Sequence, residues 1–192
     1  NGNVDAKPDM ALISLSVVTQ GKNAAAAAKS NADSSNTLCA ALEKFGCKPE
    51  DMKTTEFSIY ATYTQEKEPV LTGYSAVNSL TVTHRDLTTL GKLIDLSISS
   101  GANRIGNIQF DIINKNQLMS QARKIALEDA KQKVLLYAMT GGFQLGKVKS
   151  LTEAQTYQNY GTLQRLAAQS TQDAAYVSAG TMKLSISISV VY

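Results

Sequence analysis

Three adjacent residues, His84, Arg85 and Asp86, form the densest group of side chains in this sequence that could do acid–base chemistry. His84 is the one histidine of the 192-residue chain, and an imidazole beside a carboxylate could act as a general base. Such a base needs a serine or cysteine nucleophile with an orienting partner, and the sequence offers no pattern of this kind. Arg85 and Asp86 are therefore predicted to form a structural ion pair or to hold a subunit contact. The chain is predicted not to be an enzyme.

Cys39 and Cys47 are the two cysteines and lie eight positions apart near the end of a predicted helix. Gly46 suits the left-handed residue that ends a helix, which places Cys47 where an apolar side chain packs back on the last turn. We expect two free thiols packed as small apolar residues. An intramolecular disulfide is the alternative and would require the chain to fold back sharply. Two thiols and the distant His84 are too few ligands for a metal site, so neither a metal nor another cofactor is predicted.

Tyr74 and Asn78 lie four residues apart in a segment that alternates like a strand, so both side chains point to the same face. They could bind a small ligand, but packing and hydrogen bonding to a neighbouring loop is the favoured interpretation. The residues Gly101-Ala102-Asn103 lack the lysine and the glycine spacing of a phosphate-binding loop. They are predicted to end a helix instead.

The composition predicts a soluble globular protein, with 43% hydrophobic residues, 18% charged residues and a formal net charge of +3. The nearest basic cluster, at positions 123–133, also carries Glu128 and Asp129, so no nucleic-acid partner is predicted. No apolar run approaches the ~18 residues of a membrane helix. No signal peptide precedes Asn1, which favours a mature, processed form.

Hydrophobic periodicity predicts the elements that position these residues. The central segment, 71–103, begins with a half-buried strand whose apolar face carries Tyr74, Ala76, Leu80 and Val82. Asp86 then caps a helix with apolar residues at three- and four-residue spacing, and Gly101 ends it. Similar patterns predict strands over 10–19, 53–63, 105–113, 145–152 and 182–190, and helices over 24–45 and 114–140. Asn114 and Gln117 resemble a capping box at the start of the last helix.

The resulting order is strand-helix-strand-strand-helix-strand-helix-strand-strand, which indicates an α+β fold of mainly antiparallel sheet with packed helices. The first six elements are compatible with a split βαβ plait, and the last three could form a second small lobe. We expect one domain over residues 1–192, with two intertwined α+β lobes as the alternative. Residues 153–180 are predicted to be a long polar loop, whose Tyr157 and Tyr160 could pack against a partner. The strands over 53–63 and from residue 71 are expected to form a hairpin, and strands this long suggest hairpins that project from the body and need covering by a neighbouring subunit.

Motifs spread over nearly the whole chain carry a family resemblance. They are 4–11 (Val-Asp-Ala-Lys-Pro-Asp-Met-Ala), 71–74 (Leu-Thr-Gly-Tyr) with Ala76 and Asn78, Arg85-Asp86-Leu87, Gly101-Ala102-Asn103, Ala122-Arg123 through Ala126 to Asp129-Ala130, and 188–192 (Ile-Ser-Val-Val-Tyr). In this order and spacing they resemble the SIMPL family of bacterial periplasmic or outer-membrane-associated proteins.

The resemblance implies an exported protein, a link to oxidative-stress defence and ring- or channel-like homo-oligomers, with no established enzymatic activity. We therefore expect a non-enzymatic periplasmic protein that forms a homo-oligomer and could associate with the outer membrane. A periplasmic small-molecule-binding module, or a protective module that uses Cys39 and Cys47 in thiol redox chemistry, is the alternative. Tyr74, Asn78, Arg85, Asp86, Tyr157 and Tyr160 are the candidate structural or interface residues.

Overall fold

The structure, a computed structural model, describes residues 1–158 and 180–192, with residues 155–158 described by their backbone alone. The described chain divides into two compact units. Residues 9–111 form the plait unit. Residues 1–8, 112–158 and 180–192 form the long-helix unit.

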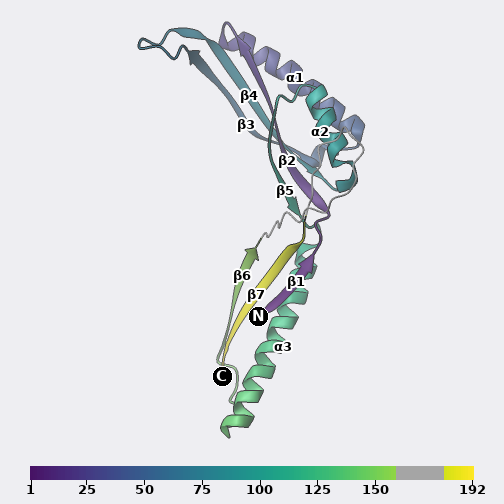
Figure 1. Cartoon of the computed structure of the whole chain (residues 1–192), viewed down its shortest axis with the longest axis vertical. Helices are drawn as coiled ribbons and strands as arrows, with labels where there is room; N and C mark the ends of the chain where they lie inside the picture. The colour runs from purple at the N-terminus through teal and green to yellow at the C-terminus, as the bar shows by residue number, and fades with distance from the viewer. Residues whose placement is uncertain (159–179) are drawn as a thin grey trace. The chain divides into compact units, whose positions relative to one another are not determined.

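The plait unit is a four-stranded antiparallel sheet covered on one face by helices (Figure 1). Its elements in chain order are β2 (Met10–Gly21), α1 (Ala24–Phe45), β3 (Met52–Tyr63), β4 (Leu71–His84), α2 (Leu90–Ser99) and β5 (Arg104–Asp111). Short 3₁₀ turns, η1 (Pro49–Asp51) and η2 (Leu87–Thr89), precede β3 and α2. The strand order β3-β4-β2-β5 is that of a split βαβ plait, so this prediction for the first six expected elements is confirmed.

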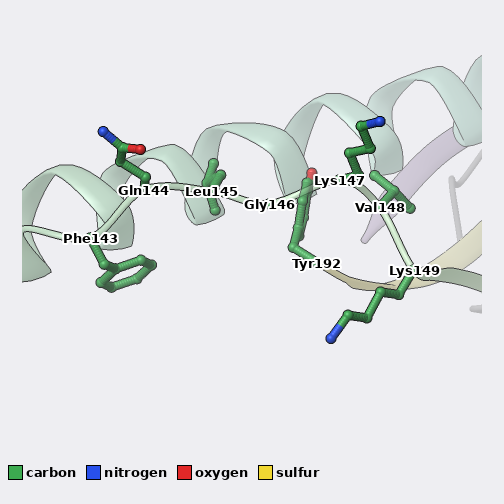
Figure 2. Close-up of a pocket in the computed structure, with 8 residues that line it drawn as sticks. All are labelled: Phe143, Gln144, Leu145, Gly146, Lys147, Val148, Lys149 and Tyr192. Atoms are coloured by element: carbon green, nitrogen blue, oxygen red, sulfur yellow. The ribbon is translucent and has the colours of Figure 1, made fainter.

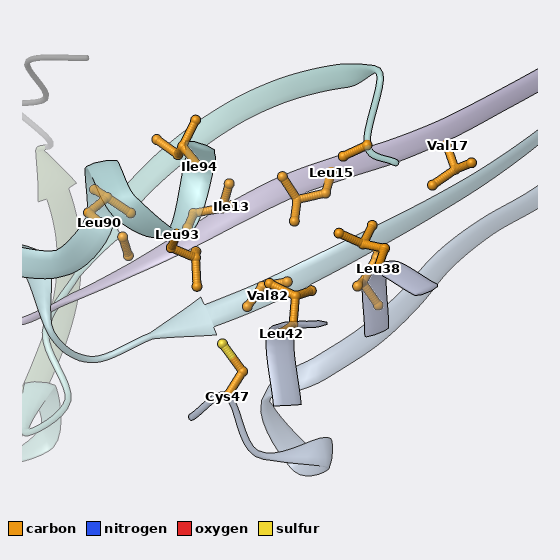
Figure 3. Packing of buried hydrophobic residues seen from close by; sticks show 13 residues of the cluster. Ile13, Leu15, Val17, Leu38, Leu42, Cys47, Val82, Leu90, Leu93 and Ile94 are labelled. Carbon is orange, nitrogen blue, oxygen red and sulfur yellow. The ribbon is translucent and has the colours of Figure 1, made fainter. Parts of the chain in front are cut away.

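The core of the plait unit lies between this sheet and α1 and α2 (Figure 3). Every second residue of β2 from Ala11 to Val17 is buried against the helices, which is the alternation that the sequence predicted. The fully or almost fully buried side chains are Ala11, Ile13, Leu15 and Val17 of β2, Leu38 and Leu42 of α1, Val82 of β4, and Leu90 and Leu93 of α2. Large branched side chains from the sheet and from both helices therefore make up this core.

Helix α1 begins and ends at residues whose chemistry specifies those positions. The Asn23 side chain accepts a hydrogen bond from the Ala26 amide at 2.8 Å, which satisfies one of the free donors of the first turn. Gly46 adopts φ 110° at the C-terminal end, as the sequence predicted. Within the helix, the buried Asn31 amide group donates to the Val17 and Ala76 carbonyl oxygens at 2.8 and 3.0 Å. This side chain therefore ties α1 to β2 and β4 at once.

Strand β4 has buried residues on both faces, whereas a half-buried strand was predicted. The face away from α1 carries Ser75, Val77 and Ser79, and all three are less than 9% exposed. The reason is position, because β4 lies between β3 and β2 and its small side chains are shielded by larger neighbours on both sides. The Ser79 hydroxyl also lies 2.9 Å from the Ser16 hydroxyl across the strand pair. The expectation of one solvated face is therefore wrong for the middle of this strand.

The long-helix unit is a three-stranded antiparallel sheet packed against one helix (Figure 1). It contains β1 (Gly2–Ala6), α3 (Lys115–Gly141), β6 (Ser150–Gln158) and β7 (Met182–Val191), with strand order β1-β7-β6. Its core joins one face of β7 to the first half of α3 through Met119, Ala122, Ala126, Met182, Leu184 and Ile186. Small side chains let the helix approach the strands closely. A Cβ placed on Gly2 would lie 1.9 Å from the Ala122 carbonyl oxygen.

The two antiparallel sheets with packed helices confirm the predicted α+β class. Strand β1 is an addition, since no element was predicted before residue 10. Strand β6 begins at Ser150 and runs to Gln158, so it takes up the start of the segment predicted as a loop. Residues 159–179 of that segment lie outside the described part of the chain. Asn114 does precede α3, but its side chain makes no capping hydrogen bond, so the predicted capping box is wrong.

Candidate functional site

Tyr74 and Asn78 both belong to β4 and lie on the same face of it, as predicted, and Asn78 contacts α1. The Asn78 amide group donates to the Ser35 hydroxyl at 3.2 Å, and Ser35 donates to the Asn31 side-chain oxygen at 3.3 Å. This chain of hydrogen bonds joins the sheet to α1. The contacts of Asn78 therefore match the packing interpretation rather than a ligand-binding one, and Tyr74 is half-buried at the same face.

Arg85 and Asp86 follow β4 and have different partners, so the predicted ion pair between them is wrong. Arg85 Nη1 pairs with Asp51 Oδ2, and the Asp51 side chain is 8% exposed. Asp86 instead caps the 3₁₀ turn η2, where its side chain accepts from the Thr88 amide at 3.0 Å and the Thr88 hydroxyl at 2.6 Å. Hydrogen bonds from Thr88 and Thr89 lower the pKa of Asp86 below its usual value. Both acids therefore hold the backbone where β4 leads into α2.

His84 lies beside this turn with its Nε2 atom 2.9 Å from the Thr89 hydroxyl. Burial lowers its pKa, and the nearby Asp86 carboxylate raises it by less. The ring also lies tilted against Phe45, with centroids 6.0 Å apart. Among the described residues, no group of three or more His, Cys, Asp and Glu side chains is placed to hold a metal ion. The imidazole is thus a packed, neutral side chain at the end of the core.

Cys39 and Cys47 are free cysteines in and just after α1. Cys47 is buried in the plait core near Leu42 and Val82, and Cys39 packs against the edge of that core (Figure 3). Burial raises the pKa of both thiols, and the carboxylates of Glu43 and Asp51 raise it further. The protonated thiol is a poor nucleophile, so both residues behave as small apolar side chains.

The tyrosines of the predicted loop are placed only in part. Tyr157 is in β6, where its backbone pairs with Leu184 of β7. Tyr160 lies outside the described residues. Neither of these predictions about a partner contact is tested by the described backbone.

The C-terminal end of α3 and the segment after it expose a group of large apolar side chains. The exposed fractions are 60% for Leu136, 64% for Tyr137, 82% for Met139, and 54% each for Phe143 and Val148. Lys131, Lys147 and Lys149 are exposed beside them. We call these eight residues the basic helix end. Large apolar side chains exposed around the end of one helix are typical of a segment that another molecule covers.

The segment 143–149 runs back along α3 and borders a hollow of about 450 Å³ (Figure 2). Phe143, Lys147, Lys149 and Tyr192 are among the side chains that line it. Figure 2 shows the Lys147 and Lys149 ammonium groups pointing away from each other, while the Phe143 ring lies near the end of the helix. The hollow is therefore part of the basic helix end and makes that surface concave.

A second exposed apolar group lies in the plait unit, on the hairpin formed by β3 and β4. Tyr60 is 50% exposed, Tyr63 57%, Val70 59% and Leu71 49%. Glu66 and Glu68 are exposed in the turn between the strands. The Thr64 amide donates to the Val70 carbonyl at 2.9 Å and the Val70 amide to the Thr64 hydroxyl at 3.0 Å, which orders the turn. We call these six residues the acidic hairpin.

The sequence interpretation missed the first surface, although a signal for it was present, and it expected a projecting hairpin without naming the exposed residues of the second. Residues 134–139 are six consecutive apolar positions, and at 100° per residue they point to all sides of a helix. A helix packed on one face must therefore leave several of them exposed. The hairpin itself was expected. Alternation predicts which of its residues share a face, but it does not tell whether a helix covers that face at the outer part of β3.

Comparison with known proteins gives the family. The SIMPL family, described as "Protein of unknown function (DUF541)", matches residues 1–192. The chain belongs to the SIMPL family. The resemblance that the motifs carried is thereby confirmed.

Three SIMPL-related proteins illustrate the relationship. The 26 kDa periplasmic immunogenic protein of Brucella melitensis is 30% identical over 202 residues, which cover 100% of this chain and 81% of the relative. The uncharacterized protein YggE of Edwardsiella ictaluri is 30% identical over 152 residues, or 78% of this chain and 63% of the relative. YggE of Escherichia coli K12 is 29% identical over 129 residues, or 67% of this chain and 52% of the relative.

The chain is thus a SIMPL protein with a relative that is named periplasmic. No described helix combines the length and the apolar character needed to cross a membrane. Neither the family description nor these names assign a reaction, so the two exposed surfaces are the candidate functional sites of the described chain.

Proposed function

We propose that this SIMPL protein is a non-enzymatic periplasmic protein that works as a homo-oligomer. Its localisation is supported by the Brucella relative, which is named periplasmic. The role as an assembly is supported by the surfaces of the described chain rather than by a cleft with reactive groups.

The observation that carries this proposal is the exposure of large apolar side chains in both units. Met139 is 82% exposed and Tyr137 64% exposed at the basic helix end. In the plait unit, Phe57 is 58% exposed on the edge strand β3, and Tyr63 is 57% exposed at the hairpin. A monomer would present these groups to water, whereas subunit contacts would bury them. Among the described strands, β3 also forms the edge of its sheet, which another chain could cover.

The thiol-redox alternative is disfavoured by the environment of the cysteines. Burial and neighbouring carboxylates raise the pKa of Cys39 and Cys47, so few thiolates form near neutral pH. The two residues instead fill space at the end of α1. A small-molecule-binding role could use the hollow beside α3, which our proposal assigns to protein contacts.

Light scattering after size exclusion, over a concentration series, tests the assembly. We expect a discrete mass of several subunits at micromolar concentration, with a ring- or channel-like particle as the form that the SIMPL resemblance implies. A stable monomer at every concentration would overturn the homo-oligomer. Attention would then turn to ligand binding at the hollow.

The family resemblance extends this proposal to oxidative-stress defence and outer-membrane association. We expect a deletion strain to survive hydrogen peroxide less well, and the Cys39→Ser, Cys47→Ser double variant to restore survival as the unaltered protein does. Loss of protection by a folded double variant would contradict the non-thiol role. Fractionation of the same strain would show whether the protein sediments with outer membranes, and recovery in the soluble periplasmic fraction alone would remove that association.

A further inference from the structure

The two exposed surfaces differ in charge. Between residues 130 and 149 the sequence has lysines at 131, 133, 147 and 149 and no aspartate or glutamate. Lys133 pairs with Asp129 at 2.8 Å. The ion pairs found in the described chain do not involve Lys131, Lys147 or Lys149. The basic helix end therefore combines an apolar centre with three positive charges.

The acidic hairpin has the opposite balance. Residues 60–71 carry Glu66 and Glu68 against the single Lys67, and all three are exposed. Tyr63, Val70 and Leu71 lie at the ends of the two strands that hold this turn. This surface also has an apolar centre with charges beside it, and its net charge is negative.

We propose that the acidic hairpin of one copy docks on the basic helix end of a second copy. This inference rests on the proposed homo-oligomer and names the surfaces that would form it. The apolar side chains of both surfaces would be buried together, and Glu66 and Glu68 would lie near Lys147 and Lys149, which project from opposite sides of the segment 143–149. Apolar burial supplies the affinity of such contacts, while complementary charge sets the orientation and rejects wrong pairings.

Charge also argues against the simpler symmetric contacts. Two hairpins docked on each other would bring Glu66 and Glu68 against their own copies, and two helix ends would do the same with Lys147 and Lys149. Like charges placed together disfavour an interface. The contact is therefore heterologous, with a different surface on each partner. Such contacts repeat from copy to copy, giving a ring where the rotation closes and a filament where it does not.

Charge reversal on either surface should break the assembly. We expect the Lys147→Glu, Lys149→Glu variant and the Glu66→Lys, Glu68→Lys variant each to raise the concentration for half-assembly at least about tenfold, because like charges then meet at the contact. The matched control is Lys22→Glu with Lys92→Glu, which changes the net charge equally at exposed positions of the plait unit. This control should assemble as the unaltered protein does. Circular dichroism checks that each variant is folded.

Mixing the two reversed variants is the decisive step. The reversed hairpin of one then faces the reversed helix end of the other, so an equimolar mixture should regain the mass of the unaltered assembly with the two variants in equal number. Recovery of mass in the mixture supports the heterologous contact. Suppose that the unaltered protein assembles. If the folded variants then keep its mass, or if their mixture stays dissociated, this contact is overturned while the homo-oligomer stands. An unaltered protein that is monomeric would overturn both.

Discussion

In the plait unit, two helices cover one face of a four-stranded sheet and bury branched side chains such as Ile13, Leu42 and Leu93 completely. In the long-helix unit, one 27-residue helix meets a three-stranded sheet, and its buried positions are Met119, Ala122, Ala126 and Ala138. Alanines permit close approach but bury little apolar area. The first unit therefore completes its core from its own residues, whereas the second keeps large apolar residues such as Leu136 at its surface. Under the proposed homo-oligomer, the long-helix unit would gain part of its stability from contacts with another copy.

The largest expected effect tests the core of the plait unit. Leu93 of α2 is fully buried, so Leu93→Ala removes apolar contacts and leaves a cavity, at a cost of about 2–5 kcal/mol in the free energy of unfolding. Leu136→Ala is the matched control in the long-helix unit, because Leu136 is 60% exposed. For this control, urea denaturation of dilute protein, below the concentration at which copies assemble, should show a free energy of unfolding within about 0.5 kcal/mol of the unaltered value. If both variants lose the same free energy of unfolding, Leu136 is covered within a single chain. The two units would then not differ in how far each completes its own core.

A smaller effect tests the close packing of the long-helix unit. Gly2→Ala places a Cβ 1.9 Å from the Ala122 carbonyl oxygen, so β1 must move away from α3. We expect a loss of about 1–3 kcal/mol, as for other overpacked sites. Gly146→Ala is the control, since a Cβ there meets no atom within 4 Å. Hydrogen exchange should show faster exchange in β1 and β7 for the first variant alone. Unchanged protection of these strands would mean that the helix does not depend on this close approach.

The fold was largely predictable because period-two and helical patterns record which residues are buried. The even-numbered face of β7 and the glycine ends at Gly46, Gly101 and Gly142 follow directly from such local rules. Strand β1 was missed because it is short and pairs with β7, which lies about 180 positions away in the chain. Such a distant pairing leaves little trace in local periodicity.

The candidate site was less predictable because side-chain partners depend on tertiary placement. Arg85 was assigned to its neighbour Asp86, but Asp51 of a different turn reaches it instead. The basic helix end could have been suspected from its six consecutive apolar residues. Whether the basic helix end remains exposed depends on where the sheet of the long-helix unit ends. Local sequence patterns do not show where a sheet ends.

The smallest expected effect is a difference between the two units in how their stability depends on pH. Burial lowers the pKa of His84 below its usual 6.5, so the unfolded chain takes up a proton more readily than the folded chain does. The stabilisation from the neutral ring is therefore complete above about pH 6.5 and is lost as the pH falls through the lower pKa of the folded state. Partial exposure to solvent screens the effect, which we expect to be below about 1 kcal/mol.

This response should be confined to the plait unit, because His84 is the single histidine of the sequence. Hydrogen exchange between pH 7 and pH 5, corrected for the intrinsic rate, should show opening of β2 and β4 becoming easier while β1 and β7 keep their protection. His84→Gln keeps a polar group near Thr89 but does not titrate, so it should flatten the response of the plait strands. An equal response in both units, or one that persists in His84→Gln, would mean that carboxylates rather than this imidazole control stability in the range. The contrast between the units would then rest on packing alone.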